Sequence, residues 1–282
     1  MNIVILSRDA SLYANRRLLQ AAHSRGHSIR VCDPLSESNA IREYLSPGRD
    51  CVLPRYGPRW QAQGQAMLET LARYGIASCN RCDAMALARA KPESAARFRQ
   101  AGLPLPGTLF FSERLSHQAF MALKRAWPQV IKRNDSAQGD GVTLHQDPNS
   151  AWQRMQQLFG AKVTFALQDF IAESAGTDIR VFVVGGKALA AMQRTALPGE
   201  FRANRHLGSQ VQSIGLSPEL EALAVRAAAC LGLEIAGVDI LISSRGPLLL
   251  EVNACPGFEA LEAATGVDVA GKILDLLETR QN

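Results

Sequence analysis

The sequence of 282 residues lacks a long apolar run, and only 6% of its residues are aromatic. A helix that crosses a membrane needs about 20 consecutive apolar residues, so no membrane association is expected. The chain opens on a short apolar strand, without a basic segment or a cleavage site, and a cytoplasmic location is therefore expected. A hydrophobic content of 47% with 20% charged residues is typical of a globular protein with two or three compact units.

The sequence also lacks the cysteine spacing that indicates a disulfide framework. The six cysteines are scattered along the chain, which suits a reducing compartment. Cys79 and Cys82 form a single C-x-x-C pair with no second pair and no neighbouring histidine. Half-buried thiols at a strand end explain this pair better than a zinc site does.

Two common nucleotide-binding loops are absent. The loop at residues 7–11 follows the first strand but lacks the G-x-G-x-x-G that cradles a dinucleotide, which argues against an oxidoreductase. No G-K-S or G-K-T enters a helix, so there is no Walker loop. Residues 1–168 carry 22 Lys and Arg against 12 Asp and Glu. Because these charges form no cluster and few aromatics interleave with them, direct nucleic-acid binding is not expected.

The sequence does contain two apolar strands near its C-terminus that carry three oxygen-bearing side chains. A hairpin centred on Arg245 puts Asp239 opposite Glu251, with Asn253 on the same face. Two carboxylates about 5 Å apart repel each other unless something neutralises them. Oxygen ligands without His or Cys favour Mg²⁺ or Mn²⁺ over zinc. A solvated strand face is the alternative, but the other face of both strands is apolar, which favours a metal site.

The first 82 residues alternate strands and helices and are predicted to form a small open α/β domain. The expected elements are strands at residues 3–6, 28–32, 51–54 and 76–79 and helices at residues 14–24 and 59–74. Further along, three strands with a Gly-Gly hairpin are expected between residues 163 and 194, followed by a helix over residues 218–231.

Two lysines stand out. Lys91 is the first lysine in the chain and lies between a helix over residues 84–90 and one that begins at Pro92. A residue before proline avoids helical geometry, which aims its ammonium out of the helix path, although a solvated linker lysine is an equal alternative. Lys132 lies in a strand before a glycine-containing loop at residues 134–141. This loop fits a hairpin that folds over nucleotide phosphates with Lys132 as a point charge, although an ordinary turn is the default.

Several motifs together resemble the ATP-grasp ligases. They are the glycine hairpin after a strand lysine, Asp178-Ile-Arg180, Glu200-Phe-Arg202-x-Asn204, and Gly-Val-Asp239 followed by Glu251-Val-Asn-x-x-Pro-Gly. The opening Ile-Leu-Ser-Arg-Asp, the Val52-Leu-Pro-Arg-Tyr-Gly and the segment from Thr265 to Lys272 are most similar to the RimK branch, glutamate ligases that act on the tail of a ribosomal protein. The resemblance covers nearly the whole chain.

This resemblance implies an α/β (α+β) fold, the ATP-grasp fold with an N-terminal Rossmann-like pre-ATP-grasp domain. The N-terminal domain would span residues 1–82. A central ATP-grasp subdomain with the glycine hairpin would span residues 83–167, and a C-terminal subdomain with the metal site residues 168–282.

The resemblance also implies roles for single residues. The ATP-binding residues that it implies are Lys91, Lys132, the adenine-contacting hinge residues Gln168, Asp169 and Phe170, the ribose-binding Asp178, and the triphosphate-contacting Arg202 and Asn204. Asp239, Glu251 and Asn253 would hold two Mg²⁺ or Mn²⁺ ions, with Glu251 bridging them. Arg194 and Arg202 would stabilise the tetrahedral oxyanion, and a surface salt bridge is the alternative for each, more so for Arg194.

The implied reaction joins a carboxylate to an amine through an acyl phosphate made from ATP. The expected substrates are an amino acid, glutamate first, and a peptide or protein C-terminus, and the family suggests a homo-oligomer. The chain departs from the family pattern at Ser136, at Asp169 and in the segment from His206 to Ser209, and these positions bear on the choice of amino acid and acceptor. A dipeptide or small-molecule amino-acid ligase and a non-catalytic ATP-binding regulatory protein are the alternatives.

Overall fold

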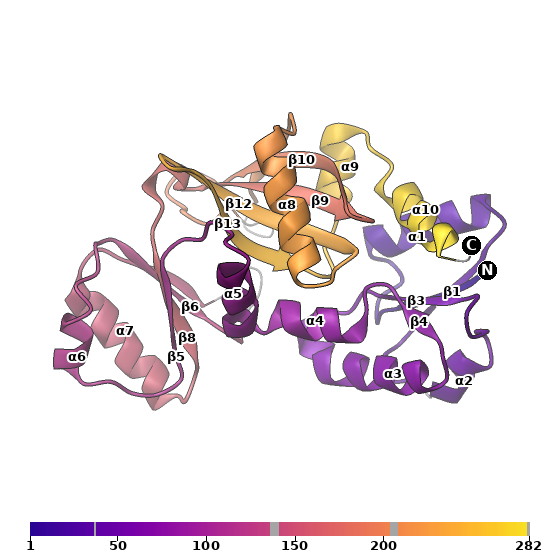
Figure 1. The fold of residues 1–282 in the computed structure, drawn as a ribbon, viewed down its shortest axis with the longest axis horizontal. Coiled ribbons are helices and arrows are strands. Elements are labelled where there is room, and N and C mark those ends of the chain that lie inside the picture. Colours follow the sequence, from indigo (N-terminus) through magenta and orange to yellow (C-terminus); the bar gives the residue numbers. More distant parts are fainter. Residues whose placement is uncertain (37, 136–140, 204–207, 281–282) are drawn as a thin grey trace.

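The structure is a computed structural model that describes residues 1–36, 38–135, 141–203 and 208–280. It contains three β-sheets, and Figure 1 shows the N-terminal sheet and a smaller lobe at opposite ends of the molecule with a five-stranded sheet between them. Both marked chain ends lie beside the N-terminal sheet (Figure 1). In the described ranges, no helix combines the length and the apolar character needed to cross a membrane.

The strands of the N-terminal sheet run parallel in the order β2-β1-β3-β4. The chain order reverses between β1 and β3, because β1 pairs with β2 on one side and with β3 on the other. Helix α1 ends where Gly26 takes a φ of 75°, a left-handed conformation that glycine adopts without strain. The elements are β1 (Asn2–Leu6), α1 (Tyr13–Ser24), β2 (Ser28–Cys32), α2 (Ser38–Arg42), β3 (Cys51–Pro54), the 3₁₀ turn η1 (Pro58–Trp60), α3 (Gln61–Arg73) and β4 (Ala77–Ser78).

Two short helices, α4 (Cys82–Arg89) and α5 (Lys91–Gln100), lead away from this sheet. They break at Ala90, one residue before the expected break at Lys91, so that Lys91 is the first residue of α5 and Pro92 lies in its first turn. The lobe that follows has an antiparallel sheet in the order β5-β8-β6-β7. Its elements are β5 (Thr108–Phe111), α6 (His117–Met121), β6 (Gln129–Arg133), β7 (Val142–His145), α7 (Pro148–Gly160) and β8 (Phe165–Asp169).

The five-stranded sheet is antiparallel with the order β11-β10-β9-β12-β13. Gly185 and Gly186, with φ values of 57° and 74°, make the expected turn between β9 and β10. Figure 1 shows α8 lying across one face of this sheet. The elements are the 3₁₀ turn η2 (Ala172–Ser174), β9 (Thr177–Val184), β10 (Lys187–Thr195), β11 (Gln210–Ile214), α8 (Pro218–Cys230), β12 (Ile235–Ser243), β13 (Gly246–Asn253), α9 (Glu259–Thr265) and α10 (Val269–Thr279).

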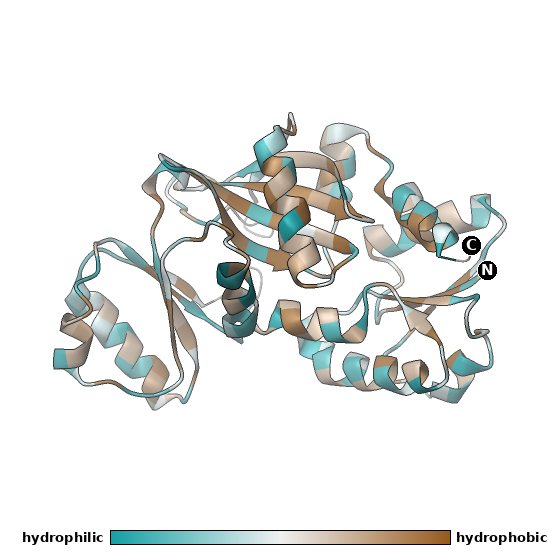
Figure 2. Cartoon of the chain, viewed as in Figure 1, coloured by the Kyte–Doolittle hydropathy of each residue, from teal (hydrophilic) through white to brown (hydrophobic). Residues whose placement is uncertain are grey.

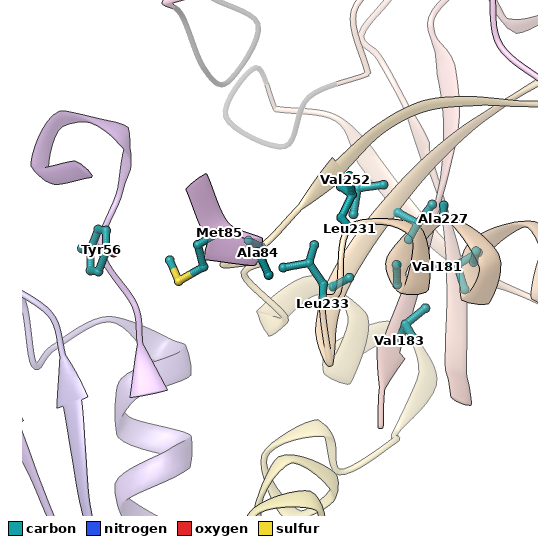
Figure 3. Close-up of a cluster of buried hydrophobic side chains, with 14 of the residues drawn as sticks. Tyr56, Ala84, Met85, Val181, Val183, Ala227, Leu231, Leu233 and Val252 are labelled. Atoms are coloured by element: carbon teal, nitrogen blue, oxygen red, sulfur yellow. The ribbon is translucent and has the colours of Figure 1, made fainter. Parts of the chain in front are cut away.

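Two apolar cores join the N-terminal domain to the five-stranded sheet. In the first, Tyr56 and Met85 belong to the same buried cluster as Val181, and Figure 3 shows Met85 of α4 between Tyr56 and the side chains of the sheet. In the second, Leu18 of α1 packs with Leu274 of α10. Figure 2 shows the matching pattern, since the strands of the five-stranded sheet are largely hydrophobic.

The lobe of β5–β8 has a core of its own. The buried members of this cluster all come from residues 120–167, among them Phe120, Ile131 and Phe165. The described residues of the lobe therefore share no large apolar cluster with the other two sheets.

Candidate active site

The predicted hairpin is formed by β12 and β13, and Asp239 lies opposite Glu251, as expected. The turn falls at Ser244 and Arg245, half a residue before the expected centre. Further along the hairpin, Leu250 of β13 has no partner in β12. This β-bulge shifts the register by one residue, so that Asp239 again lies opposite Glu251. The pairing is thus confirmed, whereas the simple hairpin centred on Arg245 is wrong, because a period-two pattern does not reveal a bulge.

Asp239 is buried between two arginines on neighbouring strands. Arg180 Nε donates to Asp239 Oδ1 at 2.7 Å, and Arg180 Nη2 donates to Oδ2 at 2.6 Å. Arg194 Nη2 lies 3.1 Å from the same Oδ2. Arg194 also donates to both oxygens of Asp178, each at 2.6 Å. The sheet register creates this arrangement, since Asp178 pairs with Arg194 and Arg180 pairs with Asp239.

The four side chains form an electrostatic network on one face of the sheet. Burial alone would raise the pKa of Asp239, but Arg180 and Arg194 outweigh it and hold this pKa at about 2. Burial also pushes the pKa of Asp178 upward, against the hydrogen bonds from Arg194. Arg194, expected at the oxyanion, and Asp178, expected at the ribose, are therefore bonded to each other.

Glu251 and Asn253 lie beside this network. Asn253 Nδ2 is 3.2 Å from Glu251 Oε1 and 3.4 Å from Asp239 Oδ2, and the Glu251 side chain is exposed. No cluster of three His, Cys, Asp or Glu side chains that could hold a metal occurs in the described part of the chain, and the amide of Asn253 is the further oxygen-bearing group beside Asp239 and Glu251.

The donor set fits a hard divalent cation. An ionised carboxylate has about four lone-pair directions, and Oδ1 of Asp239 accepts a single hydrogen bond among the described contacts. A flip of the Asn253 side-chain amide would exchange its NH₂ and its oxygen, so that the oxygen would point toward Asp239 and Glu251. Asp239, Glu251 and Asn253 would then offer oxygen ligands only, which is the set that Mg²⁺ and Mn²⁺ prefer.

The two predicted lysines face these carboxylates. Burial lowers the pKa of Lys132 to about 8, while Glu251, Asp178 and Asp239 pull it back upward. Burial lowers the pKa of Lys91 as well, against the charge of Glu251, and Lys91 Nζ donates to the carbonyl of Arg133 at 3.1 Å. Lys132 in β6 and Lys91 at the start of α5 therefore come within electrostatic range of Glu251, although they belong to different parts of the fold.

The predicted adenine hinge lies at the end of β8, where the lobe joins the five-stranded sheet. Gln168 is buried and its Nε2 donates to Thr108 Oγ1 at 2.9 Å. Asp169 forms an ion pair with Arg125 at 2.5 Å, so its carboxylate is engaged within the lobe. Phe170 packs edge to face against Phe201, with ring centroids 6.3 Å apart. Because Phe201 precedes Arg202, the aromatic contact connects the hinge to the loop at residues 196–203.

Arg202 forms an ion pair with Glu200, whose carboxylate accepts from Arg202 Nε at 2.9 Å and from Nη2 at 2.7 Å. These hydrogen bonds hold the pKa of Glu200 at about 2. Asn204, the other predicted triphosphate contact in this loop, lies outside the described residues.

Sequence reasoning missed the role of Arg180. The pattern Asp178-Ile-Arg180 shows that both side chains share a face, but it gives no partner for the arginine. The structure supplies the partner, since β9 and β12 are neighbours and Arg180 meets Asp239 across them. Pairing of β9 with β12 is a property of sheet order, which is not contained in either strand alone.

Two family models match the chain, and their boundary falls within α4. A RimK PreATP-grasp domain matches residues 1–85, and a RimK-like ATP-grasp domain matches residues 88–277. The chain belongs to the RimK-like ATP-grasp family. The expected ATP-grasp fold with an N-terminal pre-ATP-grasp domain is confirmed, and so is the expected enzyme class, a ligase.

Relatives of this RimK-like ligase match it over nearly its whole length. A protein of Thioalkalivibrio sulfidiphilus named probable alpha-L-glutamate ligase is 40% identical over 99% of this chain and 95% of its own. A solved structure of the ATP-grasp ligase PsnB with a minimal precursor, Mg and ADP has a TM-score of 0.75 at 21% identity, covering 100% of this chain and 97% of that one. D-alanine–D-alanine ligase of Bacillus anthracis with ATP gives a TM-score of 0.75 at 18% identity, with coverage of 100% and 97%. ATP-grasp ligases use ATP and divalent metals in general.

The RimK-like ligase should bind ADP more weakly as the pH rises through about 8, because Lys132 is expected to contact the nucleotide phosphates. The pKa of Lys132, lowered to about 8 in the free protein, makes this side chain lose its charge at a pH where ordinary lysines keep theirs. Nucleotide phosphates favour the charged form, so affinity is highest below pH 8 and falls above it. Calorimetric titration with ADP from pH 6.5 to 9.5 measures this. Lys132→Arg keeps its charge over the whole range and should flatten the profile, and an unchanged slope in that variant contradicts the assignment.

Proposed function

We propose that this ligase joins an amino acid, L-glutamate, to the C-terminal carboxylate of a peptide or protein, with ATP and two Mg²⁺ or Mn²⁺ ions. The grouping of Asp239, Glu251 and Asn253 on one sheet face, opposite Lys132, is the observation behind it. The name of the 40% identical relative supports glutamate as the amino acid, and the precursor bound to PsnB is in line with a peptide acceptor.

In the proposed reaction an oxygen of the acceptor carboxylate attacks the γ-phosphorus of ATP, ADP leaves, and an acyl phosphate forms. The unprotonated amine of the amino acid then attacks the acyl carbon, inorganic phosphate leaves, and the nitrogen gives up a proton. Divalent ions held by Asp239, Glu251 and Asn253 would supply neutralisation of the phosphate charge. Most of the catalysis is therefore positioning and charge stabilisation.

The other side chains have proposed roles around this reaction. Lys91 and Lys132 act as point charges on the phosphates. Arg194 is fixed by two carboxylates, and its Nη1 makes no hydrogen bond to the described residues, so it can donate to a developing oxyanion. The remaining assignments are residues 168–170 for the adenine, Asp178 for the ribose, and Arg202 and Asn204 for the phosphates and the acyl phosphate.

Mass spectrometry of small proteins and peptides tests the proposal, after incubation of a cell extract with the purified ligase, ATP, Mg²⁺ and each amino acid in turn. Whole glutamyl units added to one species support it and name the acceptor. ADP release with a product made only from free amino acids points to a small-molecule ligase instead. ATP binding without any amide product across the panel indicates a regulatory protein.

A further inference from the structure

Two arginines lie at the carboxyl edge of the N-terminal sheet, beside the point where its chain order reverses. Arg55 directly follows β3, and Arg89 is the last residue of α4. In open parallel α/β sheets, ligands bind outside the carboxyl ends of the strands at this reversal, where the loops of β1 and β3 diverge. The order of the strands therefore predicts a ligand-binding site at the position of Arg55.

The loop that follows the metal-ligand strand reaches this edge. Arg55 Nη2 donates to the carbonyl of Pro256 at 2.8 Å, and its guanidinium lies 5.8 Å from the ring centre of Phe258. Pro256 is three residues beyond Asn253 in the chain. Arg55 is thus attached to the segment that begins at the candidate metal site.

Arg89 reaches the same place from α4. Its Nη2 donates to the carbonyl of Tyr56 at 2.6 Å and lies 3.8 Å from Cys255 Sγ, and its guanidinium is 4.8 Å from the ring centre of Tyr56. Tyr56 is fixed in turn by close packing, because a Cβ added at Gly64 would lie 2.3 Å from its ring. The carbonyl that Arg89 contacts is therefore held in position by the N-terminal core.

Neither arginine has a carboxylate partner among the residues that the structure describes. Arg17 of α1, which is likewise partly exposed, does have one in Glu262. Arg55 is only partly exposed, and burial lowers its pKa against the opposing effect of the Cys255 thiol, with no Asp or Glu paired to it in the described ranges. Two partly buried guanidiniums that contact carbonyls, a thiol and aromatic rings but no described carboxylate are a charge arrangement that an anion would complete.

We propose that Arg55 and Arg89 bind a substrate carboxylate, one that does not itself react, next to the loop that leads from the metal ligands. The proposal rests on the proposed function, because it is a ligase of amino acids and peptide tails that has such carboxylates to hold. Guanidinium groups suit this ligand because their planar donors match a carboxylate in a two-point geometry. The carboxylate comes from the incoming amino acid or from an acidic acceptor tail.

Steady-state kinetics of Arg55→Gln and Arg89→Gln test this site. The KM for the substrate that supplies the carboxylate should rise about 10- to 100-fold in each variant, the effect of losing a charge-assisted hydrogen bond, while the KM for ATP stays unchanged. Arg55→Lys keeps the positive charge and should recover part of the loss. The matched control is Arg81→Gln, because Arg81 is exposed at the other end of α4 and pairs with Asp83.

Amide analogues identify the source of the carboxylate. If the amino acid supplies it, the wild-type preference for glutamate over glutamine falls in the variants. If the acceptor supplies it, the preference for an acidic tail over the same tail with Glu replaced by Gln falls instead. Equal effects on all substrates including ATP, or KM values equal to those of Arg81→Gln in variants that fold normally, overturn the proposal.

A binding measurement separates this inference from the proposed function. Calorimetric titration with L-glutamate and with an acidic peptide, in the presence of ADP and Mg²⁺, needs no turnover. Binding by the wild type that is lost in both variants supports the carboxylate site even when no amide product forms. Equal binding by the wild type and the variants overturns it. The absence of binding to either probe by the wild type, together with unchanged KM values in the variants, overturns it as well.

Discussion

Replacing Glu251 with glutamine should lower ADP formation by about three orders of magnitude or more while the protein stays folded. Glu251 is the exposed member of the candidate metal site, so its replacement removes the negative charge of a cation ligand without opening the core. A bound metal contributes several kcal/mol of charge stabilisation in the transition state, and each factor of ten in rate corresponds to about 1.4 kcal/mol. Coupled detection of ADP with saturating ATP and Mg²⁺ measures the loss.

Glu259→Gln is the matched control for Glu251→Gln. Glu259 is another exposed glutamate, at the start of α9 and eight residues further along the chain. Its replacement should leave both turnover and thermal unfolding unchanged, since substitutions of this kind at the surface change stability by about 0.5 kcal/mol or less. Retained turnover in Glu251→Gln would rule out its assignment as a metal ligand.

Replacing Arg194 with methionine should destabilise the protein by about 3–5 kcal/mol. This change leaves Asp178 buried without its two hydrogen bonds and removes one of the two guanidiniums that hold Asp239 ionised. The midpoint of urea unfolding, followed by circular dichroism, measures the effect. A second change, Asp178→Leu, removes the uncompensated carboxylate and should recover much of the lost stability.

Arg8→Met is the control, because Arg8 pairs with Asp33 at an exposed position and such pairs contribute about 0–1 kcal/mol. The pH dependence provides a further check. The pKa of Asp239 is about 2 in the folded protein and 3.8 in its ordinary range, so its ion pairs stabilise the fold above pH 4 and cease to do so as the pH falls toward 2. The difference between wild type and Arg194→Met should therefore be largest near neutral pH and shrink toward pH 2. A small, pH-independent difference would contradict the network.

Local patterns predicted much of the fold. The strands expected at residues 28–32 and 51–54 are found with these limits, because each has an apolar pattern bounded by turn residues. The turn at Gly185 and Gly186 follows from the same logic. In the site, the opposition of Asp239 and Glu251 was predicted from spacing alone.

What the sequence did not provide depends on contacts between distant segments. Asp239 was expected to face a metal only, yet it also meets Arg180 and Arg194, because β12 lies next to β9 and β9 next to β10. Arg55 and Arg89 lie 34 positions apart and become neighbours only when β3, α4 and the loop after β13 converge. The spacing of residues along one element carries no information about contacts between different elements.

The separate core of the β5–β8 lobe has a mechanical consequence. Two buried clusters connect the N-terminal domain to the five-stranded sheet. The lobe packs around its own side chains, and the segments at residues 101–107 and 170–176 link it to the rest of the chain. We expect the lobe to rotate about these two segments, which would carry Lys132 toward or away from Glu251. A phosphate site shared by Lys132 and Glu251 would be complete at one hinge angle only, so a nucleotide bound to both would hold the enzyme closed during its reaction.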